Sequence, residues 1–78
     1  MDNYISKAAI EARRARYKPG TRVELVRLGD DPYSKLQPGD QGWTEETDDA
    51  GTVFVKFDHG STLGMLFGID EIKVLTSR

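Results

Sequence analysis

A tryptophan and four carboxylates lie within seven residues in the middle of the sequence: Trp43, Glu45, Glu46, Asp48 and Asp49. Tryptophan is enriched among the residues that dominate the binding energy of protein interfaces, and nearby carboxylates attract a basic partner. The pattern therefore predicts a surface that binds a protein with a basic face. The structural alternative is that Trp43 covers an open end of the fold while the acids are only solvated.

A second cluster is basic and lies near the N-terminus: Arg13, Arg14, Arg16 and Lys18. Such a cluster could contact phosphates, which makes a nucleic-acid-associated module an alternative function. The sequence pI of about 5.3 argues against that function, because nucleic-acid-binding domains are usually basic. A solvated helix face is the simpler interpretation.

Tyr33, which lies between Pro32 and Pro38, is the remaining candidate partner-binding residue. Aromatic residues on the long loop of true SH3 domains hold polyproline ligands. One aromatic residue is too few for that groove, and a structural role in pinning a long loop is the alternative.

No combination of side chains predicts catalysis or metal binding. His59 is the only histidine, and it shares a tight turn with Asp58 and Ser61, where side chains splay apart instead of converging as a hydrolytic triad requires. No cysteine or second histidine completes a transition-metal site, and Asp30-Asp31 lacks the spacing of a calcium loop. No glycine-rich phosphate loop opens a helix. We expect a protein that is not an enzyme and needs no cofactor.

These side chains must be positioned by 78 residues, which suit one small domain. The chain is 37% hydrophobic and 31% charged, a globular balance. No apolar run approaches the roughly 20 residues of a membrane span, and the N-terminus lacks the apolar core of a signal peptide. The absence of cysteine fits a reducing compartment. A cytoplasmic protein with no membrane partner is expected.

Charge is divided unevenly along the chain. The net charge is −2, but residues 1–18 carry +3 and residues 19–78 carry −5. A basic arm on an acidic body indicates two faces with different partners, or a helix that docks on its own barrel or on a neighbouring one. A homo-oligomer is therefore possible.

The basic arm is predicted to be a helix over residues 1–17, capped by Asp2 or Asn3. Its apolar stripe is thin, so the helix needs a surface to lie on, because an isolated helix of this length is marginal in water. Ile10 and Tyr17 point away from this stripe. The stripe comprises Tyr4, Ile5, Ala8, Ala9, Ala12 and Ala15.

Residues 18–78 are predicted to form a barrel of five short strands, at 22–28, 42–47, 52–57, 61–66 and 72–75. Hydrophobic residues change phase at Leu25-Val26, which indicates a bulge. A long first loop, tight later turns and a corner before the last strand are typical of an SH3-like barrel. The fold is thus expected to be mainly β, a five-stranded SH3-like small barrel preceded by one N-terminal helix. Its expected core is Val23, Leu25, Val53, Val55, Phe57, Leu63, Ile72 and Val74.

The run Tyr17-Lys18-Pro19-Gly20-Thr21-Arg22-Val23-Glu24-Leu25-Val26 resembles the opening of domain-of-unknown-function family 4314. The likeness covers roughly residues 10–75. Members are short proteins of bacteria, phages and mobile elements. The resemblance implies a small barrel and carries no established activity. Its later motifs are Asp31-Pro32-Tyr33, Pro38-Gly39, Gly42, Asp48-Asp49-Ala50-Gly51, Val55-Lys56-Phe57-Asp58, Gly60-Ser61-Thr62-Leu63 and Gly68-Ile69-Asp70.

The chain departs from that resemblance in one strand. Similar sequences read Gly-Thr-Val-Thr-Gly-Val-Asp-Asp where residues 42–49 stand here. Thr44 and Thr47 take the place of apolar residues, at an expected cost in stability, and Trp43 appears beside them. Functional sites tend to lie where several neighbouring residues depart from the pattern that stabilises their strand.

These observations together predict a non-catalytic binding module of phage or mobile-element type. It would act as a small inhibitor or adaptor, including inhibition of a bacterial defence system, through an acidic face that binds a basic host or phage protein. One alternative is the nucleic-acid-associated module. Another is a small-ligand or nucleotide sponge whose pocket forms between subunits of an oligomer.

Overall fold

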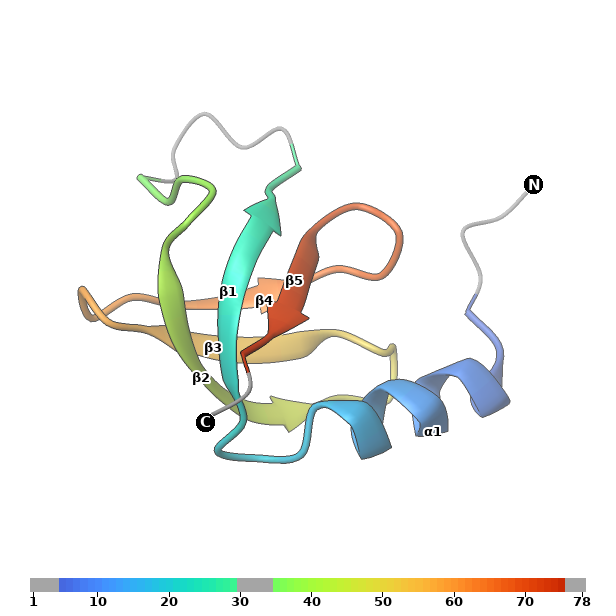
Figure 1. Cartoon of the computed structure of the whole chain (residues 1–78). Coiled ribbons are helices and arrows are strands. Elements are labelled where there is room, and N and C mark those ends of the chain that lie inside the picture. Colours follow the sequence, from blue (N-terminus) through green and yellow to red (C-terminus); the bar gives the residue numbers. More distant parts are fainter. Residues whose placement is uncertain (1–4, 30–34, 76–78) are drawn as a thin grey trace.

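One helix and five antiparallel strands make up the fold, in a computed structural model that describes residues 5–29 and 35–75 (Figure 1). The strand order is β4-β3-β2-β1-β5, so β5 returns to pair with β1. The predicted fold, a small SH3-like barrel after an N-terminal helix, is confirmed. The elements are α1 (Lys7–Arg16), β1 (Arg22–Arg27), β2 (Gln41–Thr47), β3 (Val53–Phe57), β4 (Thr62–Met65) and β5 (Glu71–Val74).

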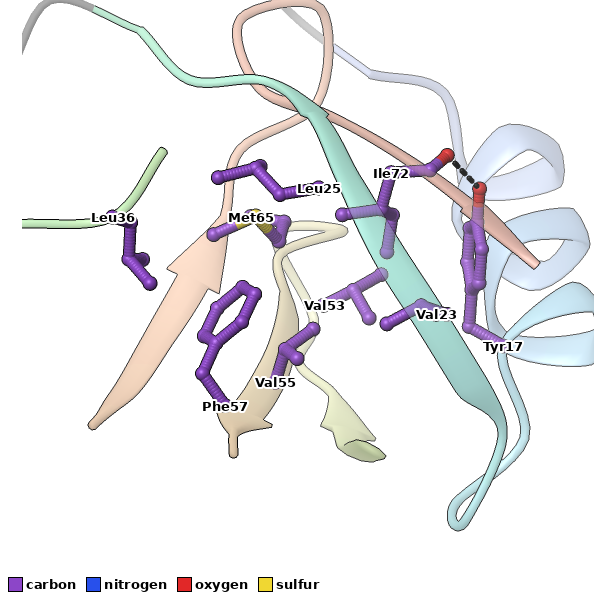
Figure 2. Close-up of a cluster of buried hydrophobic side chains, with 9 residues drawn as sticks. All are labelled: Tyr17, Val23, Leu25, Leu36, Val53, Val55, Phe57, Met65 and Ile72. Carbon is purple, nitrogen blue, oxygen red and sulfur yellow. Dashed lines mark hydrogen bonds between the residues drawn. The ribbon is translucent and has the colours of Figure 1, made fainter. Parts of the chain in front are cut away.

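The core lies inside the curved sheet and follows the predicted alternation of side chains (Figure 2). Six of the expected core residues are buried, and Leu63 and Val74 are partly buried against them. The core also contains Tyr17, Leu36 and Met65, which the alternation pattern did not indicate. Tyr17 comes from the end of the helix, and Leu36 comes from the loop after β1. The helix and this loop therefore close parts of the barrel that the strands leave open.

The bulge predicted in the first strand is present. The pairing of β1 with β5 shifts register between Leu25 and Arg27, so Val26 is exposed while Leu25 is buried. A second irregularity interrupts the pairing of β2 with β3 between Thr44 and Thr47. Bulges increase local twist, which lets a sheet of short strands curve around a core.

The helix begins later than predicted, and only part of its predicted stripe packs. Ser6 is its N-cap, with its Oγ accepting the Ala9 N–H at 3.1 Å, so the predicted caps Asp2 and Asn3, which lie outside the described residues, do not begin it. Ile10 lies beside Gly51 and Tyr17 is in the core, although both were predicted to point away from the stripe. Of the stripe itself, Ile5 also lies beside Gly51 and Ala9 is partly buried, whereas Tyr4 lies outside the described residues. Three of the stripe's alanines are exposed, because alanine offers little area to bury: Ala8, Ala12 and Ala15.

The two threonines of β2, both predicted to cost stability, are buried but differ in their bonding. Thr44 Oγ1 donates to the Lys18 carbonyl at 2.7 Å and accepts the Thr21 N–H at 2.9 Å. It therefore ties the segment after the helix to β2, and its hydroxyl is not left unpaired in the core. In the described part of the chain, Thr47 Oγ1 is buried without a hydrogen-bond partner.

This difference predicts opposite effects of the same substitution. Thr44→Val should lower the free energy of unfolding by about 1–3 kcal/mol, because two bonded groups lose their partner, whereas Thr47→Val should raise it by about 1 kcal/mol. Urea unfolding of both variants checks the prediction. Equal destabilisation by the two substitutions would contradict the assigned bonding.

Candidate functional site

Trp43 lies near the centre of the outer face of the sheet. It pairs with Arg22 of β1 on one side and with Lys56 of β3 on the other. Its side chain is 50% exposed and takes no part in the core cluster. Trp43 therefore lies on the outer face of the central strand, and this position gives no support to the alternative in which it covers an open end of the barrel. An aromatic side chain half-exposed on a central strand is available for contact.

A network centred on Arg22 holds one face of the indole ring. The Arg22 guanidinium carbon lies 4.7 Å from the centroid of the Trp43 ring, a cation–π contact. The same guanidinium donates to both carboxylate oxygens of Asp58, at 2.8 and 2.7 Å, and to Gln41 Oε1 at 3.1 Å. Hydrogen bonds from Arg22 hold the pKa of Asp58 below its ordinary value, and the same bonds raise the pKa of Arg22.

The four acids predicted to accompany Trp43 have different surroundings. Glu45 and Glu46 are exposed at the irregular end of β2, and within the described residues neither forms an ion pair. Asp48 Oδ1 instead accepts the N–H groups of the turn that follows, from Ala50 and Thr52, each at 2.9 Å. Asp48 thus shapes the turn between β2 and β3, as aspartate often does.

Two basic residues of the helix, Arg13 and Arg14, lie against this turn. Arg13 Nε donates to the Gly51 carbonyl at 2.8 Å, and its Nη2 donates to the Met65 carbonyl at 3.3 Å. Burial lowers the pKa of Arg13, since the charged form loses hydration. The Cζ atom of Arg13 also lies 5.3 Å from the centroid of the Phe67 ring. Arg13 therefore joins the helix, the β2–β3 turn and the end of β4.

Arg14 adds a second link to the same turn. Its Nη2 donates to the carbonyls of Thr47 and Asp48, at 3.1 and 3.2 Å, and reaches the exposed Asp49 carboxylate at 3.4 Å. Its Nη1 also bonds the Glu11 carboxylate within the helix, at 3.2 Å. The acidic cluster and the basic cluster, predicted as separate sites, thus meet within one molecule.

The other predicted site residues lie apart from these contacts. Arg16 is exposed at the end of α1 and donates to Tyr17 Oη at 3.3 Å. The Lys18 side chain is exposed. Tyr33 lies outside the described residues.

An apolar surface that the sequence analysis did not single out follows β4. Leu66, Phe67 and Ile69 are 44–46% exposed in the segment between β4 and β5. The Asp70 carboxylate fixes this segment by accepting the Gly29 N–H at 2.6 Å and the Leu66 N–H at 2.8 Å. A groove of about 630 Å³ lies beside it. One feature of the sequence could have indicated this surface: residues 60–69 contain no charged residue, in a chain that is 31% charged.

Over residues 5–29 and 35–75, no three histidine, cysteine, aspartate or glutamate side chains gather where they could hold a metal ion. No helix within those residues is both long and apolar enough to span a bilayer.

Comparison with known proteins identifies one family. The family described as "Domain of unknown function (DUF4314)" matches residues 6–75, nearly the whole chain. No curated protein is significantly similar to the sequence.

The Arg22–Asp58 pair predicts a stability contribution that acid removes. The pKa of Asp58 is lower in the folded chain, so the contribution is complete above the unfolded value of about 3.9 and is lost as the pH falls through the folded pKa. Thermal melts of the wild type and of Asp58→Asn should differ at neutral pH and converge in acid. A difference in melting temperature that persists unchanged below about pH 2 would contradict the pairing.

Proposed function

We propose that this chain, which belongs to the DUF4314 family, is a non-catalytic module that binds another protein through the outer face of its sheet around Trp43. The observation that carries the proposal is the half-exposed indole ring held from one side by Arg22. A rigid aromatic side chain loses little conformational freedom on binding, which is why such residues dominate interface energies.

The chemistry around Trp43 favours a basic partner. Glu45 and Glu46 are exposed two and three residues after Trp43 in β2, while Asp58 compensates the charge of Arg22. Unpaired carboxylates at the rim of an interface steer a cationic partner during encounter more than they hold it afterwards. Asp48 and Asp49 contribute less, because the first shapes a turn and the second faces Arg14. The corresponding biological role is a small inhibitor or adaptor, of phage or mobile-element type, that occupies a basic surface of a host protein in the cytoplasm.

The two alternative functions stay predictions with less support. Nucleic-acid binding by the helix would have to rely on Arg16 and Lys18, because the donors of Arg13 and Arg14 reach backbone carbonyls of the sheet. A small-ligand sponge would require a second copy to close a pocket that is an open groove in the single chain.

Replacing the tryptophan should remove binding without unfolding the domain. Trp43→Ala should lose about 2 kcal/mol or more of binding free energy, mostly through faster dissociation. Its melting temperature should stay near that of the wild type, because the ring lies outside the core. A partner captured from bacterial lysate by the wild type and then purified allows both rates to be measured by surface plasmon resonance.

The matched control is Val26→Ala, which shortens an exposed apolar side chain on the bulge of β1. This control should bind as the wild type does. Stoichiometric capture of the same partner by Trp43→Ala with an unchanged dissociation rate would rule out the outer face as the binding surface.

A further inference from the structure

The two edges of the sheet are protected unequally. At one edge, β5 carries Glu71 and Lys73, and Tyr17 Oη donates to the Ile72 carbonyl at 3.5 Å. At the other edge, β4 has no charged residue. Natural sheets usually blunt an open edge with charge, proline or a covering segment, because exposed backbone groups recruit further strands.

The backbone of β4 is oriented to accept another strand. In an antiparallel pair the hydrogen-bonded positions alternate. Phe57 N–H donates to the Ser61 carbonyl at 2.8 Å, which makes Leu63 the next residue of β4 bonded to β3. Thr62 and Gly64, on either side, therefore direct their N–H and C=O groups away from β3, toward the open edge. The Arg13 bond to the Met65 carbonyl does not occupy this edge, because Met65 alternates with Gly64 and is directed toward β3.

The groove beside this edge is mostly apolar. Two carboxylates, of Asp48 and Asp70, are the only charged groups among its lining residues in the described part of the chain. Gly64 lets the Thr52 methyl and the Phe54 ring pack against the β4 backbone, because a Cβ atom there would come within 2.7 Å of Thr52 Cγ2 and 3.1 Å of the Phe54 ring. Its larger apolar lining residues are Leu28, Phe54, Leu63, Leu66 and Ile69.

We infer that the β4 edge docks an extended segment of a partner protein, with apolar side chains at alternate positions and at least one lysine or arginine. The open backbone groups would bond the segment as an added strand, and alternate side chains would enter the groove. Both carboxylates also accept backbone N–H groups, but no cationic side chain of the described residues lines the groove beside them, so the groove favours a cationic occupant. A second copy of this chain does not fit that requirement through β4, because residues 60–69 contain neither lysine nor arginine.

This surface is separate from Trp43 and can be tested separately. A displayed library of random linear peptides is selected against the purified full chain. The enriched sequences should alternate apolar residues and carry a lysine or arginine. A synthetic peptide of the enriched sequence should bind about tenfold more weakly to Thr62→Pro, because proline removes an edge N–H that does not bond β3.

Thr62→Lys is a second test that keeps the backbone N–H. Its positive charge should repel the cationic peptide and weaken peptide binding to a similar extent. If Thr62→Pro fails to fold, the affinity of Thr62→Lys for the peptide tests whether the peptide binds the β4 edge. Val26→Lys, which adds the same charge on the bulge of β1, should bind as the wild type does. Trp43→Ala should also leave peptide binding unchanged, which separates this surface from the proposed function.

Three results would overturn the inference. One is the absence of enriched peptides, or enrichment of acidic or non-alternating ones. Another is unchanged peptide affinity in folded Thr62→Lys. The last is a dimer, detected by size exclusion with light scattering, that Thr62→Lys converts to monomer, because the edge would then belong to a second copy.

Discussion

Guanidinium groups of the helix donate hydrogen bonds to backbone carbonyls at the β2–β3 turn and at the end of β4. These bonds fix the position of the helix relative to the sheet. Arg13 reaches Gly51 and Met65, and Arg14 reaches Thr47 and Asp48. Arginine suits this task because its planar group presents several donors in a fixed geometry, whereas lysine offers a single point charge. The helix is thereby fixed across one end of the sheet, and Tyr17 enters the core beside Ile72 (Figure 2).

Because Arg13 and Arg14 are bonded within the molecule, part of its basic charge is not available to a partner. The basic arm and the acidic turn face each other, so neither is wholly free to meet a partner of opposite charge. Arg16 and Lys18 stay exposed at the end of the helix. On the sheet, Trp43 lies on the outer face, two exposed glutamates follow it in β2, and an uncharged strand with exposed apolar neighbours lies at the β4 edge. The exposed aromatic and apolar side chains, which contribute most to interface energies, are therefore on the sheet and on the segment after β4.

The strands could be predicted from the sequence because alternation of side chains is a local signal. Val53, Val55 and Phe57 are buried as their spacing indicated, and the phase change at Val26 marked the bulge. The packed face of the helix could not be predicted in this way. Arginine is counted as polar, yet its stem packs and its head bonds carbonyls that only the folded sheet brings near.

The same limit applies to the site. Trp43 was identifiable by residue type, but its support by Arg22 and Asp58 depends on the pairing of β1, β2 and the turn after β3. The satisfied hydroxyl of Thr44 depends on the segment of residues 18–21. The β4 groove was not recognised because its lining comes from the end of β1, from β3, from β4 and from the segment before β5. Such surfaces are products of tertiary structure and have no contiguous motif.

Proton exchange at the arginine side chains tests most directly whether the helix belongs to the folded sheet. Nuclear magnetic resonance resolves the Nε–H proton of each arginine and its rate of exchange with water. The Arg13 proton, bonded to the Gly51 carbonyl, should exchange at least about tenfold more slowly than that of Arg27, which is exposed on β1. Equal exchange rates for Arg13 and Arg27 would mean that the helix is not held by these carbonyls, and the basic cluster would again be free to bind a partner.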